Sequence, residues 1–395
     1  MSAHTSTHRI VLVCEATGGG VGKHVLDVAE HLPERGLDVL LVHGTRRTEP
    51  DFADRLSRHA AHGYRVAHVD VDRAPGPRDI VGVAQLRRAV RAFGGADVMH
   101  GHSAKGGALA RLARWGCARR VFYTPHAFYA QAPTLSSAAR RVYGLAEYGL
   151  AFATDRVIAT SREELELART LGIPARKLTV VENGIALRDD AELAHARAET
   201  RSSLGVTDRD LVVGFVGRLV PQKAPLLAVE TFRRLRSAHP SARFVLAGDG
   251  PEAAAVSRAL ADTTMTPHVR WIQRSVGRDL MPGLDVLLVT SQYEGFPYVM
   301  LEALDAGCAI VTTSVGGARD CVIDGRNGEI VALHTGEALA HAVSGFLTRP
   351  DALRVARATS RVRARQFAIG RMVDRLVALY RGEDVGDSSE TRNAA

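Results

Sequence analysis

The chain has 395 residues, 46% of them hydrophobic and 24% charged, and its formal net charge at pH 7 is +8. This length exceeds what one hydrophobic core usually serves, so two domains are expected. Aromatic residues make up only 5% of the chain, which leaves little for base stacking and argues against a nucleic-acid partner.

Short apolar runs and amphipathic stretches alternate along the first half of the chain, a rhythm typical of a parallel α/β sheet. The expected elements are Ile10–Val13, Val21–Leu32, Val39–Val42, a helix over Val81–Phe93, Val98–His100, Ala108–Trp115 and Val121–Tyr123.

After Asn183-Gly184 a polar, Ala-rich stretch runs to about Asp210, and the same rhythm then restarts. We therefore predict an N-terminal domain over residues 1–185, a linker over 186–209 and a C-terminal domain over 210–366, with a polar, disordered tail at 382–395. The expected elements of the second domain are Leu211–Val216, Ala224–Leu235, Arg243–Ala247, Val269–Ile272, Asp285–Thr290 and Ile310–Thr313. Ligands of such sheets bind beyond the carboxyl ends of the strands, so a cleft between two facing domains is the expected site.

The N-terminus, the apolar runs and the cysteines indicate a cytoplasmic protein. MSAHTSTHR at the start is polar, and no apolar run approaches the roughly 20 residues that span a bilayer. The four cysteines show neither CxxC nor metal-ligand spacing. We expect free thiols in a reducing compartment and no bound metal.

Positive charge is concentrated in the first half of the chain. Residues 1–185 hold 25 Lys and Arg against 18 Asp and Glu, and residues 78–120 hold nine basic side chains against Asp79 and Asp97. An anionic partner, such as an acidic membrane surface or a lipid-diphosphate acceptor, is one interpretation. Arginine-rich, solvated helix faces are the other.

A Gly-rich turn follows the first strand and suggests an alternative function, nucleotide binding by a P-loop or a dinucleotide-binding loop. Residues 17–24 read TGGGVGKH, whereas a P-loop needs a Gly at the first of these positions and Ser or Thr at the last. Thr17 and His24 stand there instead, and Val25 breaks the dinucleotide fingerprint. Asp70 and Asp72 spell a DxD, which we interpret as structural because it closes a short strand away from the other motifs.

The most informative segment, SQYEGFPYVMLE, runs from Ser291 to Glu302. A strand ends there and a helix is expected to begin near Pro297, a preferred first helical residue. The free N–H groups of that helix start can seat a phosphate. Two flanking carboxylates, Glu294 and Glu302, can accept hydrogen bonds from sugar or ribose hydroxyls.

This E-x7-E spacing with its EGFP start resembles the family 4 glycosyltransferases of GT-B fold. GFVGRLVPQK (214–223), AGDGPE (247–252), VVENGI (180–185) and TSVGGARDCVIDGRNG (313–328) are similar to other loops of that family. The chain departs from the family at Ala309, at Arg319-Asp320 and at Gln273-Arg274, near the base-binding loop.

The resemblance implies an α/β fold of two Rossmann-like, doubly wound domains that face a cleft, with a C-terminal helix over 367–381 returning to the N-terminal domain. It also implies roles for residues of both domains. Two cations on one turn can replace a divalent metal against a leaving diphosphate. The implied donor-binding residues are Gly19, Gly20, Arg218, Lys223, Glu294, Gly295, Phe296 and Glu302; the catalytic ones are His126, Arg218, Lys223 and Glu294; the acceptor-side ones are Gly19, His102, Lys105 and His126.

The function implied is retaining transfer of a sugar from a UDP- or GDP-sugar, without a metal or other cofactor. The HSxK segment at His102 and the basic first half favour a lipid-linked or other polysaccharide precursor as acceptor, at the inner face of the plasma membrane. The alternatives are a nucleotide-sugar epimerase or phosphorylase of the same fold, a P-loop ATPase, and a membrane-associated binding protein without activity.

Overall fold

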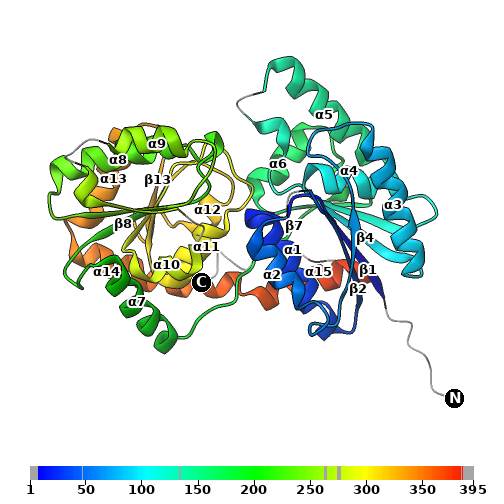
Figure 1. Cartoon of the computed structure of the whole chain (residues 1–395), viewed down its shortest axis with the longest axis horizontal. Helices are drawn as coiled ribbons and strands as arrows, with labels where there is room; N and C mark the ends of the chain where they lie inside the picture. The colour runs from blue at the N-terminus through cyan, green and yellow to red at the C-terminus, as the bar shows by residue number, and fades with distance from the viewer. Residues whose placement is uncertain are drawn as a thin grey trace. The chain divides into compact units, whose positions relative to one another are not determined.

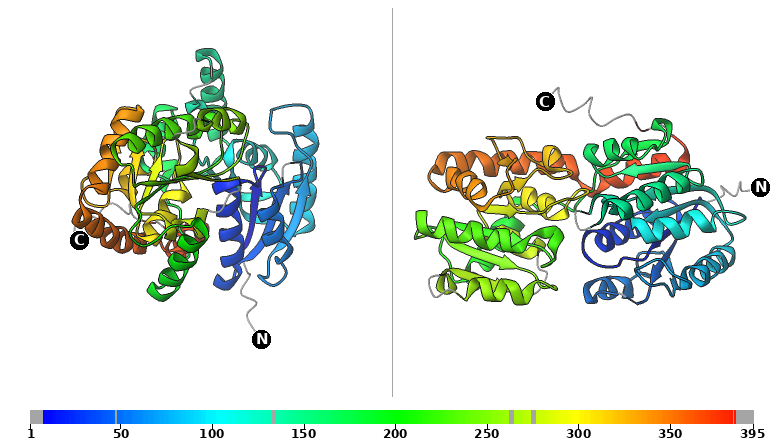
Figure 2. Two further views of the ribbon diagram at one scale, coloured as in Figure 1. Left: turned by 60° about the vertical axis from the view of Figure 1, so that its left-hand side comes forward. Right: turned by 90° about the horizontal axis from the view of Figure 1, so that it is seen from above.

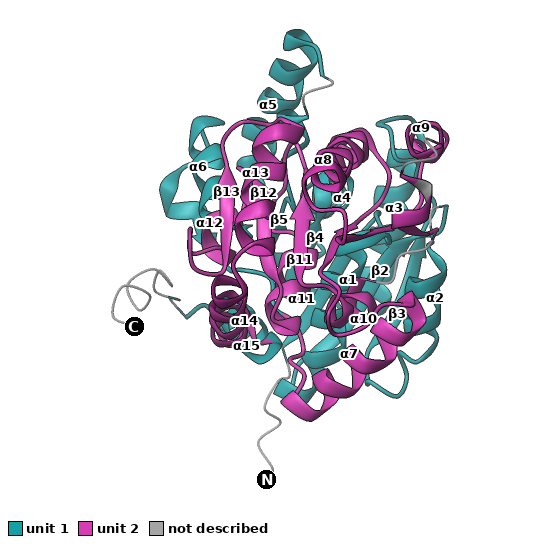
Figure 3. Cartoon of the chain, turned by 90° about the vertical axis from the view of Figure 1, so that its left-hand side faces the viewer, with its two compact units in different colours: residues 1–184, 369–395 teal, residues 185–368 magenta. Residues whose placement is uncertain are grey.

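The protein is described by a computed structural model that covers residues 8–46, 48–132, 135–261, 265–273, 277–383 and 385. The chain divides into two compact units, residues 1–184 with 369–395 and residues 185–368, coloured separately in Figure 3. Each unit is built around its own parallel sheet.

Unit 1 has a seven-stranded sheet with the order β3-β2-β1-β4-β5-β6-β7, and all its pairs are parallel. Its strands are β1 (Arg9–Cys14), β2 (Asp38–Gly44), β3 (Arg65–Val69), β4 (Ala96–His102), β5 (Ala118–Thr124), β6 (Arg156–Ala159) and β7 (Leu178–Val180). Its α-helices are α1 (Gly19–His31), α2 (Pro50–Ser57), α3 (Arg78–Ala92), α4 (Ser103–Ala113), α5 (Ser137–Ala151), α6 (Arg162–Thr170) and α15 (Ile369–Arg381). Short 3-10 turns are η1 (Pro33–Arg35), η2 (Tyr129–Gln131) and η3 (Ala175–Lys177).

Strand side chains of unit 1 alternate between two apolar layers, as the two-residue period of a strand requires. Ile10 and Leu12 of β1 pack with α1 and α15 on one face, whereas Val11 and Val13 pack with α3 and α4 on the other. Helices thus cover both faces of the sheet (Figures 1 and 2). This double burial explains why the central strands are continuous apolar runs.

The last helix of the chain, α15, belongs to unit 1. Its buried side chains, including Val373 and Leu376, join the same core as β1 and α1. At its C-terminal end, the Tyr380 hydroxyl lies 2.7 Å from Nδ1 of His100 on β4. The end of the chain therefore contributes to the core of its first domain.

Unit 2 has a six-stranded parallel sheet with the order β10-β9-β8-β11-β12-β13. Its strands are β8 (Val212–Val216), β9 (Arg243–Ala247), β10 (Val269–Ile272), β11 (Val286–Val289), β12 (Ala309–Thr313) and β13 (Gly328–Val331). Its α-helices are α7 (Asp190–Leu204), α8 (Pro225–Ala238), α9 (Ala253–Leu260), α10 (Gly277–Leu280), α11 (Tyr298–Ala306), α12 (Ala318–Cys321), α13 (Gly336–Leu347) and α14 (Pro350–Ala364). The 3-10 turns are η4 (Pro221–Lys223), η5 (Thr266–His268), η6 (Met281–Gly283) and η7 (Arg365–Phe367).

The two faces of the unit 2 sheet are also covered. Phe215 and Phe244 pack under α8, α9 and α13, while Val216 and Val289 pack against α11 and α12. The strand order reverses between β8 and β11, so the loops that follow these two strands lie beside a topological switch point. Open α/β sheets bind ligands there.

The predicted linker at 186–209 contains helix α7 and lies in unit 2. A capping box between Asp189 and Glu192 starts this helix. The apolar pattern missed it because Arg201 is its only buried side chain. Ion pairs take the place of an apolar stripe: Arg197 and Arg201 both reach the buried carboxylate of Asp285, at 2.9 and 3.4 Å.

Two other expectations concern the C-terminal tail and membrane-spanning segments. The tail predicted at 382–395 lies largely outside the described residues, which end with 382, 383 and 385. Among the helices that are described, none is both long and apolar enough to cross a membrane.

Candidate functional site

The loop after β8 is fixed from two sides within unit 2. On one side the N–H of Leu219 donates to the carbonyl of Asp249 (2.8 Å), and a Cβ added to Gly248 would lie 1.9 Å from the carbonyl of Gly217. On the other side the N–H of Gln292 donates to the carbonyl of Gln222 (2.8 Å). The loop is therefore rigid where it carries its two predicted cations.

The two cations of this loop have different environments. Lys223 forms an ion pair with Glu294, with 2.6 Å between Nζ and Oε1, so these two predicted site residues are in direct contact. Arg218 is exposed, and within the described ranges its guanidinium has no hydrogen-bond or ion-pair partner. The site thus holds one unpaired cation and one cation paired to a carboxylate, both on a single turn.

Backbone strain accompanies this turn. Ala224 adopts φ 45°, a left-handed conformation that costs a non-glycine residue about 1–2 kcal/mol, and it directly precedes α8. The Thr290 hydroxyl shares its one hydrogen between the carbonyls of Lys223 and Ala224, at 2.7 and 3.1 Å, and so fixes this backbone. Strain of this kind persists where the surroundings over-determine the conformation, as they do at functional sites.

The segment from Glu294 to Phe296 lies against a glycine turn. A Cβ on Gly316 would approach the Glu294 carbonyl to 2.4 Å, and one on Gly317, at φ 76°, would approach the Phe296 ring to 2.7 Å. Phe296 is buried and also packs on Phe367, with ring centroids 5.5 Å apart. Gly295 and Phe296 therefore shape the backbone around Glu294.

Helix α11 begins at Tyr298, one residue later than expected, because Pro297 is its extended N-cap, with ψ 125°. No side-chain hydrogen bond caps the start of this helix, and a helix N-terminus of this kind can bind an anion. Glu302 lies one turn further along α11, and its Oε2 would be 2.6 Å from a Cβ on Gly277. A glycine at 277 leaves room for this carboxylate.

In unit 1, the Gly-rich turn opens α1. Gly19 and Gly20 are exposed, and Gly19 has φ 61°. A Cβ on Gly19 would have no neighbour within 4 Å, whereas one on Gly22 would lie 1.8 Å from the Thr17 carbonyl. Gly22 is thus required by packing and Gly19 by its conformation. Lys23 pairs with Asp27 of the same helix, at 3.5 Å.

The turn after β5 carries His126 in a strained conformation. His126 and Ala127 have φ 55° and 82°. The buried carboxylate of Glu164 on α6 holds this turn by accepting hydrogen bonds from the N–H of Ala127 and the N–H of Thr160, both at 2.6 Å. Burial raises the pKa of Glu164, although these hydrogen bonds act in the opposite direction.

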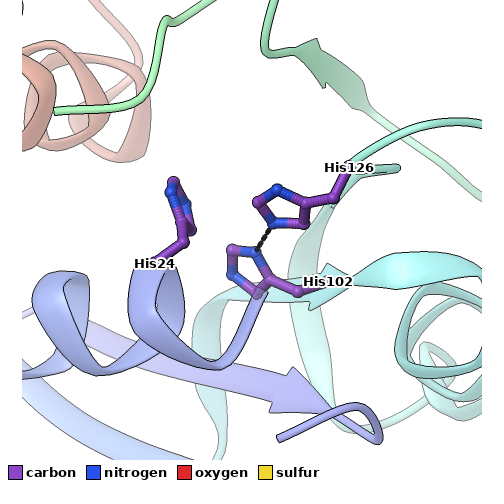
Figure 4. Close-up of side chains that lie close together, drawn as sticks. All are labelled: His24, His102 and His126. Atoms are coloured by element: carbon purple, nitrogen blue, oxygen red, sulfur yellow. Dashed lines mark hydrogen bonds between the residues drawn. The ribbon is translucent and has the colours of Figure 1, made fainter. Parts of the chain in front are cut away.

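His126 lies in a cluster with His24 of α1 and His102 at the end of β4 (Figure 4). Nδ1 of His102 is 3.2 Å from Nε2 of His126, and the His24 and His126 rings are 4.6 Å apart. Behind them, His100 lies 2.7 Å from Tyr380 and 2.8 Å from Thr124.

All four histidines are held in the neutral form. Burial lowers the pKa of His24 to about 4, although the charge of Asp27 acts against that shift. Burial and the neighbouring imidazoles lower the pKa values of His100, His102 and His126 well below 6.5. A neutral imidazole offers one N–H and one lone pair.

Lys105, predicted on the acceptor side, does not join this cluster. Its Nζ donates to both oxygens of Asp79, at 2.6 and 2.7 Å, and to the carbonyl of Ala74, at 2.9 Å. These contacts use all three ammonium hydrogens. An acceptor would have to displace one of them, so the contact with an acceptor stays a prediction.

The DxD carboxylates have partners within unit 1. Asp70 pairs with Arg46, and the hydrogen bond from Arg46 lowers the pKa of Asp70. Asp72 lies 3.4 Å from Arg78. Of the departure from the family pattern at Gln273-Arg274, the structure describes only Gln273.

Sequence reasoning missed two functional candidates. His24 entered only as the residue that breaks a P-loop, and Glu164 did not enter at all. His24 could have been found by mapping histidines onto the carboxyl ends of β1, β4 and β5, which are neighbours in the sheet. Glu164 lies 37 residues from Ala127 in sequence, and no local pattern links them.

Comparison with known proteins adds family and fold. Residues 196–363 match the family model of glycosyl transferases group 1, and residues 19–184 match that of the glycosyl transferase 4-like domain. The chain is 30% identical to D-inositol 3-phosphate glycosyltransferases of Salinispora tropica, over 98% of this chain and 86% of the relative, and of Kineococcus radiotolerans, over 100% and 97%. It resembles the crystal structure of Anabaena Alr3699/HepE in complex with UDP-glucose with a TM-score of 0.79 at 20% identity, covering 95% of this chain and 99% of that one.

Proposed function

The chain belongs to the family 4 glycosyltransferases of GT-B fold, and we propose that it is a retaining enzyme that takes its sugar from a UDP- or GDP-sugar bound on unit 2. A uridine donor is supported by the UDP-glucose complex of the Anabaena protein. The observation that carries the proposal is the contact of Lys223 with Glu294 at 2.6 Å, one turn from the exposed Arg218.

The two cations act on the leaving diphosphate. As the bond between the sugar and the diphosphate breaks, negative charge grows on the phosphate oxygens, and preorganised cations lower the free energy of that state. Arg218 provides a planar, bidentate donor set and Lys223 a point charge. The uncapped start of α11 adds N–H donors. No metal ion is needed at the diphosphate in this scheme.

When the donor binds, the Lys223–Glu294 ion pair separates, and each of the two residues contacts a different part of the donor. Lys223 turns to the diphosphate, and Glu294 becomes free to accept hydrogen bonds from the sugar. Glu302 binds the ribose. The acceptor hydroxyl attacks from the face that the diphosphate leaves, its proton passes to a phosphate oxygen, and the configuration at the sugar carbon is retained. No covalent enzyme intermediate forms.

Nucleotide binding tests the donor site directly. Calorimetric titrations with UDP, GDP and ADP are run in EDTA and in Mg²⁺, on the wild type, Arg218→Ala and the control Arg233→Ala. Arg233 is an α8 arginine that donates to the carbonyl of Ala259. We expect UDP or GDP to bind equally well in EDTA, and only Arg218→Ala to weaken binding. Strict dependence on Mg²⁺, or full affinity in Arg218→Ala, would contradict the proposal.

For the acceptor we propose a lipid-linked or other polysaccharide precursor at the inner face of the plasma membrane. Helix α5, at the top of Figure 1, supports contact with that surface. Val142, Leu145 and Phe152 are 64%, 69% and 75% exposed, and their spacing puts them on one side of the helix. Arg140 and Arg141 are exposed nearby. Apolar and basic residues together favour an anionic bilayer surface.

The basic stretch at 78–120 contributes less to this surface than its composition predicts. Arg111 is fully buried, where it pairs with Glu147 at 2.7 Å and stacks on Tyr123. Lys105 is buried with Asp79.

A vesicle flotation assay tests the membrane contact. The double substitution Leu145→Ser and Phe152→Ser should abolish binding to anionic vesicles. Val362→Ser, which changes an exposed residue of α14 in unit 2, should leave it intact. Equal binding of both variants, or binding to zwitterionic vesicles alone, would contradict this part of the proposal.

The names of the Salinispora and Kineococcus relatives favour a second acceptor, D-inositol 3-phosphate. Transfer assays with this polyol phosphate and with a lipid-linked precursor distinguish the two. Turnover with the polyol phosphate in the absence of vesicles would show that the acceptor is this compound and not a lipid-linked precursor.

A further inference from the structure

Three histidines of unit 1 come from separate elements and meet in one place. His24 lies on α1, His102 ends β4, and His126 follows β5 (Figure 4). One ring nitrogen from each lies within 4.8 Å of the other two. No purely apolar packing requirement brings three imidazoles together. His24 and His102 are buried and His126 is half-buried, so little water is left to hydrogen-bond them.

The spacing of two of these rings matches a metal site. Nδ1 of His102 and Nε2 of His126 are 3.2 Å apart. Two imidazole nitrogens bound to one tetrahedral Zn²⁺ at 2.0–2.1 Å are separated by about 3.3 Å. His24 offers the third nitrogen, within 4.8 Å of the other two.

The surroundings hold the rings in position. Ser103, directly after His102, and His126 itself have positive φ values of 61° and 55°. Nε2 of His102 is buried and has no hydrogen-bond partner among the residues that the structure describes. His100 packs against His102, with ring centroids 4.1 Å apart, and is itself held by Thr124 and Tyr380. Strained residues of this kind cluster at binding sites.

We propose that His24, His102 and His126 bind one divalent transition-metal ion, with Zn²⁺ as the best match. Three neutral nitrogen ligands suit Zn²⁺, Co²⁺ or Ni²⁺, whereas Mg²⁺ and Ca²⁺ require oxygen ligands. Three protein ligands leave a fourth position for water or an anion. If the His126 N–H is the donor to His102, only His126 must change its tautomer when the metal replaces that hydrogen bond.

A consequence for activity rests on the proposed function. His126 is predicted to contact the transferred sugar, and a metal-bound His126 cannot do so. Micromolar Zn²⁺ should therefore inhibit transfer, EDTA should restore it, and Mg²⁺ should have no effect.

The site is tested on the full chain without a polyhistidine tag, after treatment with EDTA. Co²⁺ is added as a spectroscopic probe, and Zn²⁺ is titrated in competition. The expected result is the intense visible absorption of tetrahedral Co²⁺, one equivalent per chain, which Zn²⁺ abolishes. The absence of this absorption in the wild type would overturn the proposal without any variant.

Variants locate the ligands. His24→Gln and His126→Asn should weaken Zn²⁺ binding at least about 100-fold, because loss of an outer partner alone costs roughly 10–100-fold. Asn is chosen at 126 because it tolerates a positive φ. His195→Ala, in an exposed position on α7, is the matched control and should bind like the wild type. Unchanged Zn²⁺ affinity in both ligand variants would overturn the assignment.

The proposed site and the proposed function can fail separately. UDP binding by unit 2 tests the donor site and does not depend on the histidines, and thermal unfolding reports whether unit 1 of each variant is folded. Zn²⁺ bound without inhibition would support the site and contradict the role of His126 at the sugar. Transfer that proceeds normally, together with no Zn²⁺ or Co²⁺ binding, would overturn the site and leave the transferase intact.

Discussion

The two units carry their candidate site residues at the carboxyl ends of similar parallel sheets, but these residues are charged in unit 2 and neutral in unit 1. Unit 2 presents permanent charges: Arg218 is exposed and Lys223 pairs with Glu294. Unit 1 buries neutral imidazoles, and its turn at His126 is strained. Exposed charges keep most of their hydration, whereas buried imidazoles stay neutral. The first set suits a diphosphate, and the second suits sugar hydroxyls or a divalent transition-metal ion such as Zn²⁺.

The largest expected effect is on turnover through unit 2. Lys223→Ala should lower kcat/KM at least about 100-fold. Removing one group that stabilises the negative charge developing in the transition state typically lowers kcat by a factor of about 10²–10³. The stability of the fold should change less than turnover, because the Lys223 side chain is 21% exposed and solvent partly screens the pair. Initial rates and thermal unfolding measure the two effects.

The control for this substitution is Arg234→Ala, which removes an exposed arginine paired with Glu230 on α8. Its activity should match the wild type. A folded and fully active Lys223→Ala protein would contradict the assignment of the donor site.

The second effect is on the pH dependence of stability, and it should be larger in unit 1 than in unit 2. Folding lowers the pKa values of His24, His100, His102 and His126, so the unfolded chain binds more protons below pH 6.5. Stability is therefore fully present above pH 6.5 and falls as the pH falls, for His24 down to about pH 4. Each titrating histidine contributes up to about 1.4 kcal/mol per pH unit.

Urea unfolding at a series of pH values measures this slope. Unit 2 contains no fully buried histidine among its described residues, so its unfolding should depend less on pH in this range. His24→Gln should reduce the slope of unit 1. Equal slopes in both units would contradict the burial of neutral imidazoles.

Glu164→Gln should destabilise unit 1 by about 1–3 kcal/mol, because an amide NH₂ would face a backbone donor that now has a buried acceptor. Since folding raises the pKa of Glu164, the wild type should also lose some stability as the pH rises through that pKa, and the variant should not. Glu166→Gln changes an exposed glutamate of the same helix and should be neutral. Denaturant titration that finds the two variants equal would exclude a positioning role at His126.

The smallest expected effect is at the Gly-rich turn. Gly19→Ala should cost about 1–2 kcal/mol, because φ 61° strains an L-residue although nothing blocks its Cβ. Gly76→Ala, where a Cβ also meets nothing within 4 Å, is the control and should cost little. If thermal unfolding finds the two substitutions equivalent, the conformation of Gly19 is not what selects glycine there.

Candidate site residues that belong to short, contiguous motifs were accessible from the sequence. Arg218 and Lys223 share one turn, and Glu294 and Glu302 flank one helix start, so local spacing is enough to group each pair. Helix α7 was missed for the opposite reason. Its arginines pair with Asp285, more than 80 residues away, and no apolar period reveals that contact.

The sequence by itself determined the fold class, the two sheets and the motifs of the candidate donor site, because strand periodicity and turn chemistry are local properties of the chain. The tertiary structure decided which distant polar groups meet. It joined His24, His102 and His126, attached Glu164 to the turn at His126, and paired Lys105 with Asp79. Each of these contacts depends on the order of strands in the sheet and on burial, which lowers or raises a pKa only after distant segments have packed together.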